Sequence, residues 1–368
     1  NDMFGEKPIY YLKNEKVFFF SSEINCLKNF LNTKKDSSIS KKNKFMMFGF
    51  LREDTFFKKI KYFGPATIIK IYKGEIKQKI QYWNYDQFLT SKDKKKIIEK
   101  KDIKEIKNLL VTSCEMKLNS DQPISLLLSS GIDSTLLASI YHKEINISLQ
   151  NFHASFENLD NFNSKFNETN LTTKIAEELD LNLTIEKIDF DEKLFSFKNL
   201  LKIFNEPNDN ISSLLTHKIF ETISKNYKVA ISGLGADEIF YGYNGYKFFN
   251  NNLKYIQSSF IKKLLKFFNY FNFKKLKTLK YYSKYNNLDL IFSHFNFNYF
   301  DDIKTKDFDD IVFDTKYSLI ENYSSIRFKS TLPFQMLAAS DRSSMRNSLE
   351  VRSPYLNKNL LLKTLEYD

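Results

Sequence analysis

Glycine is scarce in this chain, and its placement is the feature that most constrains the fold. The sequence has nine glycines in 368 residues, and five of them lie in two short segments, 123–135 and 229–245. Glycine lets a backbone take positive φ or approach another group closely. Each segment follows an apolar run of strand length and carries an acidic residue. We therefore expect two strand ends that face one bound ligand.

Strand-like and helix-like segments alternate from residue 103 to residue 231. The apolar run at 124–128 is typical of a parallel strand buried on both faces. Apolar residues recur at helical spacing from Ile103 to Leu118. We expect further strands at 147–156, 183–188 and 228–231, and helices at 134–142, 170–179 and 214–224. Alternation of this kind implies βαβ units, so we predict an α/β fold with a doubly wound parallel sheet.

The segments on either side differ in character. Residues 1–83 are β-rich, with short β-type runs at 8–12, 17–20 and 67–72. Residues 90–102 are highly charged and read as a linker or an exposed helix start. Residues 246–330 are rich in Phe, Tyr, Lys and Asn, and we expect mostly helices there. The predicted division is therefore a domain at 1–85, a linker at 86–102 and a second domain at 103–368.

The first glycine segment contains the loop Ser129–Ser134, between a predicted strand and a predicted helix. Such a turn presents free backbone N–H groups and the positive end of a helix dipole to an anion. Asp133 would repel a bare phosphate, but it suits a site that also holds Mg²⁺, which typically takes one or two carboxylates plus phosphate oxygens. The loop lacks the Gly-Lys of a P-loop. The alternative is a capped turn with no ligand.

The second glycine segment contains the loop Ser232–Glu238, which also follows a predicted strand. Asp237 lies 104 residues after Asp133, far enough to come from another strand of the same sheet. Ligands of doubly wound sheets bind outside the carboxyl ends of the strands. Two carboxylates from two such ends could hold one magnesium ion. The alternative is a glycine-rich turn with a solvated acidic pair.

Arginine is rarer still, and three of the five arginines fall within eleven residues: Arg342, Arg346 and Arg352. Arginine makes planar, bidentate contacts with carboxylate or phosphate that lysine cannot copy. One use is to bind a substrate carboxylate or phosphate. The alternative is a buried structural network with Asp341 and Glu350.

Composition and charge argue against a membrane-spanning, a secreted and a nucleic-acid-binding protein. No apolar run reaches the roughly 18 residues of a membrane span, and the start shows no signal peptide. Cys26 and Cys114 form no disulfide framework, which favours buried thiols in a reducing cytosol, so we expect a cytoplasmic protein. The net charge of +12 comes almost entirely from lysine spread along the chain. We read it as codon bias rather than as a nucleic-acid surface.

These motifs together resemble a known family. The first loop resembles the Ser-Gly-Gly-x-Asp-Ser pyrophosphate loop of ATP pyrophosphatases. The second loop, Asn205-Glu206-Pro207 and the stretch 341–356 are similar to the synthetase domain of glutamine-dependent asparagine synthetases. Residues 1–11 and 22–24 are similar to the tail of that family's glutaminase domain. The resemblance implies a partial α/β/β/α N-terminal-nucleophile glutaminase domain, followed by an adenine nucleotide alpha-hydrolase-like domain.

The resemblance also implies an activity and its cofactors. The enzyme would adenylate a carboxylate, aspartate before any other, with Mg-ATP, then amidate it with ammonia from glutamine, releasing AMP and pyrophosphate. ATP and Mg²⁺ are the expected cofactors, and the expected partners are small molecules, with no nucleic acid and no membrane. The sequence leaves open whether the chain forms a homodimer.

Matching positions assign the candidate residues. Asp133 and Asp237 would hold Mg²⁺, and the candidate catalytic residues are Asp133, Asp237, Glu238 and Arg342. Pyrophosphate would be held by Ser129, Ser130, Gly131 and Ser134. The adenosine pocket would be lined by Leu127, Ala154, Ser232 and Gly233.

The sequence departs from the family at four places. Ser130 replaces a loop glycine, and Leu234 stands where asparagine synthetases carry Glu, which weakens the case for aspartate. The chain begins beyond the expected N-terminal Cys and stops before an expected Lys, so we read it as a piece of a longer enzyme. Two other classes remain: a tRNA-modifying pyrophosphate-loop enzyme and a non-catalytic binding protein.

Overall fold

The computed structural model describes residues 1–13, 17–31, 38–89, 97–157, 168–189, 196–208, 210, 212–257, 314 and 316–367. Residues 258–313 and 315, within the segment where mostly helices are expected, lie outside the described residues. The N-terminal part contains these elements: β1 (Tyr10–Lys13), β2 (Phe18–Ser21), α1 (Ile24–Leu31), α2 (Ile39–Phe48), β3 (Ile60–Tyr62), β4 (Thr67–Tyr72), β5 (Glu75–Gln81) and a 3₁₀ turn, η1 (Tyr85–Phe88).

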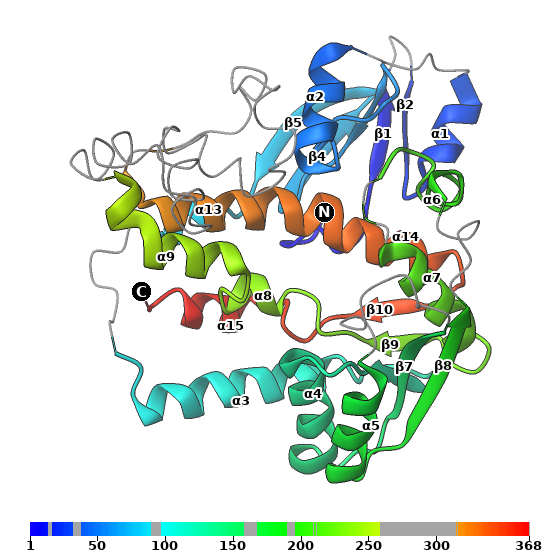
Figure 1. The fold of residues 1–368 in the computed structure, drawn as a ribbon. Coiled ribbons are helices and arrows are strands. Elements are labelled where there is room, and N and C mark those ends of the chain that lie inside the picture. Colours follow the sequence, from blue (N-terminus) through cyan, green and yellow to red (C-terminus); the bar gives the residue numbers. More distant parts are fainter. Residues whose placement is uncertain are drawn as a thin grey trace, which may run out of the picture.

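Two antiparallel sheets organise this N-terminal part, shown in blue in Figure 1. Strands β2, β1 and β3 form one sheet, and β4 and β5 form a hairpin. In β1, Tyr10 and Leu12 are buried while Tyr11 and Lys13 are not, as the period of two in a half-buried strand requires. The hairpin turns at Lys73 and Gly74, both with positive φ, which matches the right-handed twist of the strands.

The second part is built on a five-stranded parallel sheet, and it confirms the predicted doubly wound α/β fold. The strand order is β10-β9-β6-β7-β8. The chain starts at the centre, moves outward to β8, and returns to the other side for β9 and β10. The strands are β6 (Ile124–Leu127), β7 (Gln150–Glu157), β8 (Leu183–Asp189), β9 (Val229–Ile231) and β10 (Glu350–Arg352).

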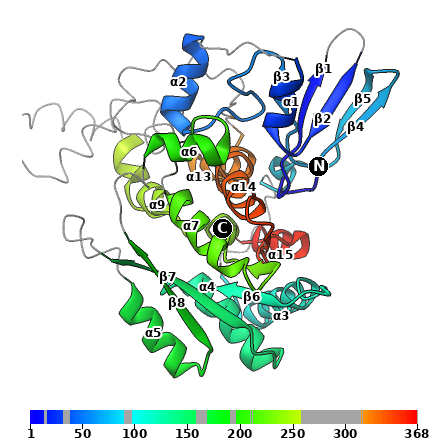
Figure 2. The ribbon, with the colours of Figure 1, turned by 90° about the vertical axis from the view of Figure 1, so that its right-hand side faces the viewer.

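Helices cover both faces of this sheet. Figure 2 shows α4 and α5 on one face and α7 and α14 on the other. The helical elements are α3 (Lys100–Met116), α4 (Ile132–Ser139), η2 (Ile140–Glu144), α5 (Thr169–Glu178), α6 (Phe197–Phe204), α7 (Ser212–Ile223), α8 (Ala236–Ile239), α9 (Asn244–Gln257), α13 (Leu319–Ile326), η6 (Arg327–Leu337), α14 (Ala338–Met345) and α15 (Lys358–Thr364).

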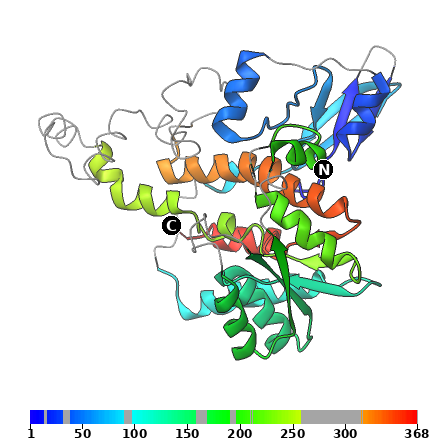
Figure 3. The same cartoon turned by 45° about the vertical axis from the view of Figure 1, so that its right-hand side comes forward.

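A long helical segment joins the two parts of the molecule. Helix α13 continues through the π-helical η6 into α14, and Figures 1 and 3 show this rod, in orange, between the N-terminal elements and the sheet. One apolar cluster includes Tyr10 and Tyr62 from the N-terminal sheet and Tyr323 and Phe334 from the rod. The two parts therefore share a core. Within the described residues, no helix is long and apolar enough to cross a membrane.

Candidate functional site

The two glycine loops meet at the point where the strand order of the sheet reverses. The first loop follows β6 and the second follows β9. Strands β6 and β9 are parallel neighbours, with Leu126 opposite Ile231. Their carboxyl ends therefore lie side by side, at the switch point where doubly wound sheets bind ligands.

The first loop is folded on its own serines. The backbone N–H of Ser129 donates to Ser134 Oγ at 3.0 Å, and that of Gly131 donates to Ser129 Oγ at 3.1 Å. Helix α4 begins at Ile132, so its first N–H groups face the loop. Ser130 has no positive φ, which makes it tolerable in place of glycine, and its hydroxyl donates to Glu168 Oε2 at 2.6 Å.

The second loop depends on glycine for two different reasons. Gly233 lies against the first loop, because a Cβ there would sit 3.4 Å from both Asp133 Cβ and the Ser134 backbone nitrogen. Gly235 has φ of +87°, and a Cβ there would sit 2.4 Å from Leu356 Cδ2. The first glycine lets the two loops touch, and the second lets the chain turn into α8.

Asp133 and Asp237 face one cavity and repel each other. Both line a cavity of about 590 Å³ at the carboxyl ends of β6 and β9. Burial raises the pKa of Asp133, and the charge of Asp237 raises it further. Burial also raises the pKa of Asp237, while the positive charge of Arg327 opposes that rise. A divalent cation would relieve this repulsion, and carboxylate oxygens are ligands that Mg²⁺ accepts.

The carboxylates fit Mg²⁺ as a partial ligand set. Within the described part of the chain, no group of three or more His, Cys, Asp or Glu side chains could hold a metal ion. A pair of carboxylates matches the usual mode for Mg²⁺ in nucleotide sites, in which phosphate oxygens and water complete the shell.

Most of the predicted site residues come together in this cavity. Beyond the two aspartates, the predicted residues that line it are Leu127, Ser129, Gly131, Ser134, Ala154, Ser232, Gly233 and Glu238. Ser130 points to Glu168 and does not line it. Leu127, Phe152, Ala154 and Ile219 give one end an apolar surface of the kind that suits an adenine ring.

Sequence reasoning missed several lining residues, and four of them carry polar or large side chains: His153, Glu168, Tyr243 and Met336. His153 is buried on β7, its Nδ1 lies 3.0 Å from Leu128 O, and burial lowers its pKa. Tyr243 stands between Gly242 and Gly245, a spacing that could have marked it. The other three carry no local signal.

Glu238 is the most enclosed carboxylate of the cavity. The residue is 3% exposed, and the hydroxyl of Tyr243 donates to Glu238 Oε1 at 2.7 Å. Burial raises the pKa of Glu238, and the hydrogen bond from Tyr243 opposes that rise. Leu234 lines the same cavity and packs on the main core.

The C-terminal motif holds both loops in place. Strand β10 pairs in parallel with β9, which the sequence did not predict. Beyond it, the hydroxyl of Ser353 donates to Leu234 O, and that of Tyr355 donates to Asp133 O at 2.9 Å. Leu356 lies under Gly235. One segment therefore fixes the backbones of both loops.

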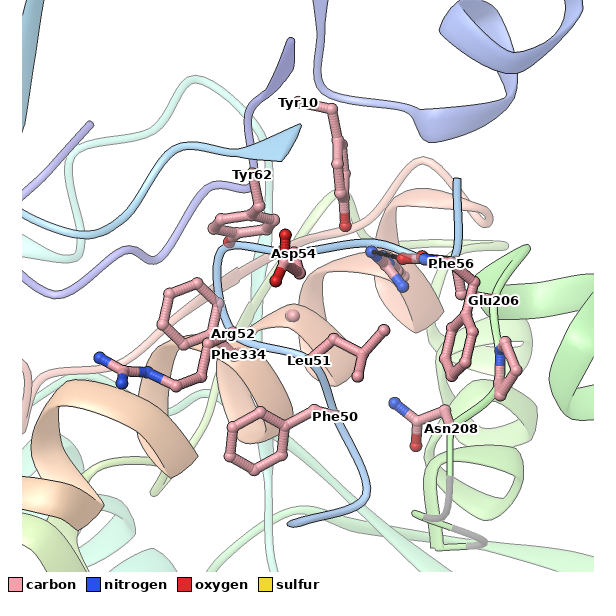
Figure 4. A pocket seen from close by; sticks show the side chains of 13 residues that line it. Tyr10, Phe50, Leu51, Arg52, Asp54, Phe56, Tyr62, Glu206, Asn208 and Phe334 are labelled. Atoms are coloured by element: carbon pink, nitrogen blue, oxygen red, sulfur yellow. Dashed lines mark hydrogen bonds and ion pairs between the residues drawn. The ribbon is translucent and has the colours of Figure 1, made fainter. Parts of the chain in front are cut away.

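Arg342 lies apart from these residues. It lines a separate cavity of about 40 Å³ between the N-terminal part and the rod, shown in Figure 4 with Tyr10, Tyr62 and Glu206 around it. Its Nη1 donates to Phe204 O at 3.1 Å, and its Nη2 lies 3.8 Å from Glu206. The geometry fits the alternative of a structural network at this position, although its partner is Glu206 rather than Asp341.

The other two arginines of the cluster are also held by the protein. Arg352 pairs with Glu350 at 2.9 Å, as the network alternative expected. Arg346 Nε donates to Ile203 O at 3.1 Å. Asp341 pairs with Lys7 at 2.8 Å instead of with an arginine.

Comparison with known proteins then settles the family. The family model for asparagine synthase matches residues 105–365, which include both loops and the C-terminal motif. The chain belongs to the asparagine synthase family. A second model, for a glutamine amidotransferase domain, matches residues 1–83. Both matches confirm the resemblance that the motifs indicated.

Individual relatives are more distant and longer. "Asparagine synthetase [glutamine-hydrolyzing] 1" of Bacillus subtilis is 29% identical over 67% of this chain and 37% of its own length. "Putative asparagine synthetase [glutamine-hydrolyzing] 2" of Methanocaldococcus jannaschii is 29% identical over 72% of this chain and 49% of its own length. The chain thus spans less than half the length of either relative.

Among solved structures, an NH3-dependent NAD synthetase from Campylobacter jejuni aligns with 57% of this chain and 90% of its own. The sequence identity is 14% and the TM-score is 0.29, too low to support a conclusion.

Proposed function

We propose that this chain is the core of an ATP-dependent amide ligase, which activates a carboxylate as its acyl-adenylate and then amidates it. The observation that carries the proposal is the meeting of Asp133 and Asp237 in one cavity at the switch point of the sheet. Family membership supports the same reaction. We propose aspartate as the first acceptor to test, with another carboxylate as the alternative because of Leu234.

The reaction has two steps. A carboxylate oxygen attacks the α-phosphorus of ATP, the bond to the β-phosphate breaks, and pyrophosphate leaves. The nitrogen of ammonia then attacks the acyl carbon, the acyl–oxygen bond breaks, AMP leaves and a proton is released. We propose glutamine as the source of ammonia, because residues 1–83 match a glutamine amidotransferase domain.

The residues of the cavity divide these tasks. The start of α4 and the hydroxyls of Ser129 and Ser134 would bind the pyrophosphate group. Asp133 and Asp237 would hold Mg²⁺, which when bound neutralises charge on the leaving group. The apolar end would bind adenine, which leaves the end near Glu238 for the acceptor.

The test is release of pyrophosphate from Mg-ATP by the full-length gene product. We would offer a panel of carboxylates that includes aspartate, with glutamine or ammonium as nitrogen donor. An Asp133→Asn variant is the inactive control, and Asp121→Asn, a change at an exposed residue before β6, is the matched active control.

The outcomes separate the readings. Release that requires a carboxylate and yields the amide supports the proposal, and the acceptor that gives it names the substrate. Release that requires RNA would indicate a tRNA-modifying enzyme. No release with any acceptor would indicate a binding protein that keeps only the fold.

A further inference from the structure

Arg327 lies behind the wall of the nucleotide cavity, outside every motif that the sequence analysis used. It is the first residue of η6, and its guanidinium carbon lies 4.3 Å from the centre of the Tyr243 ring and 5.2 Å from that of Tyr323. Its Nε donates to the Tyr323 hydroxyl at 3.0 Å. A planar guanidinium stacks on aromatic faces in a way that an ammonium does not. This chain has only five arginines among 56 basic residues, so the choice is informative.

The Tyr243 ring connects this arginine to the cavity. One face of the ring carries the guanidinium of Arg327, while its hydroxyl donates to Glu238 Oε1 at 2.7 Å. Both Tyr243 and Glu238 line the cavity, beside Asp237. A shift of the Tyr243 ring would therefore displace the buried carboxylate of Glu238, which is the neighbour of the candidate metal ligand Asp237.

Tyr323 is itself fixed by close packing. A Cβ at Gly245 would sit 2.4 Å from the Tyr323 hydroxyl, so this backbone leaves no room for a side chain. The Tyr323 ring also meets Tyr246 and Phe249 edge to face, at 5.0 and 5.1 Å. Tyr323 is 1% exposed. Arg327 thus contacts the closely packed Tyr323 on one side and the cavity-lining Tyr243 on the other.

We propose that Arg327 is a positioning residue of the site, which acts through Tyr243 to set the place of the Glu238 carboxylate at the acceptor end of the cavity. Arg327 does not line the cavity and touches no substrate. Its role for catalysis rests on the proposed ligase function, whereas its hold on Tyr243 does not.

The first test therefore needs no activity. The full chain is labelled with tyrosine carrying ¹³C at Cζ, and the Tyr243 signal is identified by its loss in Tyr243→Phe. In Arg327→Met this signal should shift or broaden. Lys329→Met is the matched control, because Lys329 is a neighbouring cation on η6 that pairs with Asp86, and it should leave the signal unchanged. An unchanged Tyr243 signal in Arg327→Met overturns the proposal.

The second test uses pyrophosphate–ATP exchange. Arg327→Met and Tyr243→Phe should each lower kcat by about tenfold, with the KM for ATP changed less than about twofold, since neither residue binds the nucleotide. The double variant should be no worse than the worse single variant, because both changes break one chain of contacts. Multiplying losses would overturn the positioning role.

Arg327→Lys keeps the charge and loses the planar stacking, and it protects the test against a variant that fails to fold. It should recover part of kcat and part of the tyrosine shift. Recovery equal to wild type in both would contradict the stacking argument. If the wild-type protein shows no exchange while the tyrosine signal moves as expected, the ligase proposal fails and the structural role of Arg327 stands.

Discussion

The two aspartates of the cavity at the switch point, Asp133 and Asp237, stand in surroundings that oppose their charge. Burial raises the pKa of each, and the charge of Asp237 raises that of Asp133 further. An acid whose pKa is higher in the folded state makes folding less favourable once the pH exceeds its unfolded pKa. Such a pair destabilises the folded protein in the absence of a ligand, and it favours the binding of a cation.

Asp133→Asn should therefore separate stability from binding. Without ligand, the variant should unfold at the same temperature as the wild type or higher, because a raised pKa means that the ionised group opposes folding at neutral pH. At about 100 times Kd, Mg-ATP should stabilise the wild type by roughly 2.7 kcal/mol, and this gain should vanish in the variant. Thermal unfolding with and without Mg-ATP checks both. A fall in the ligand-free Tm would contradict the electrostatic argument.

Glu206 predicts a pH dependence at the junction between the two parts. Burial raises its pKa from 4.5 to about 7, while the Phe56 N–H, 2.8 Å from Oε1, and the charge of Lys41 oppose the rise. Because the folded pKa is the higher one, the wild type should lose stability as the pH rises from 4.5 to 7, by up to about 3 kcal/mol.

Glu206→Gln keeps an acceptor for Phe56 and removes this titration. We expect Tm of the variant minus Tm of the wild type to grow between pH 5 and pH 8. Other acids titrate in both proteins and cancel in the difference. A difference that is flat or falls with pH would be contrary to the expectation.

At the scale of elements, the sequence predicted those strands and helices that have a local apolar pattern. Strands β6 to β9 and helices α3, α4, α5 and α7 lie near their expected places, because apolar runs and helical spacing reflect burial directly. Strand β10 was missed, since Glu350-Val351-Arg352 holds a single apolar residue. It is an edge strand that is defined by its backbone pairing with β9. Within the strand, the side chains of Glu350 and Arg352 form an ion pair.

The same limit applies to the site. Residues on the two loops were found because glycine, serine and aspartate cluster in sequence. Met336 and Glu168 reach the cavity only through packing of η6 and α5, which no local pattern reports. Arg342 lies near Asp341 in sequence but faces Glu206, which is 136 residues away.

A pair of glycine substitutions tests the loop geometry. Gly235→Ala should cost roughly 1–3 kcal/mol of unfolding free energy, because a Cβ at φ of +87° is strained and would meet Leu356. Gly131→Ala is the matched control: its φ is −69°, and a Cβ there would meet only Ser129 Oγ, at 3.2 Å. Urea unfolding should show a loss for the first and about 0.5 kcal/mol or less for the second. Equal losses would refute the assignment.

At the scale of the whole molecule, the shared core predicts one cooperative unit. Phe334 on the rod packs edge to face on Tyr62, at 5.0 Å, and stacks with Phe50, at 6.5 Å. Phe334→Ala should remove about 3–5 kcal/mol and lower the Tm of a single transition. Phe20→Ala, at a phenyl group 69% exposed, should change Tm little. Two separate calorimetric transitions would show that the parts unfold independently.

Strand β10 and the segment that follows it are synthesised after both loops, and this order has a consequence for ligand binding by a nascent chain. A growing polypeptide that has reached Glu238 already carries both loops, yet it lacks Ser353, Tyr355 and Leu356, which fix them. A nascent chain should therefore acquire affinity for Mg-ATP only after residue 356 has left the ribosome. A chain released between Glu238 and Ser353 would carry both loops without these contacts, and it should not bind Mg-ATP.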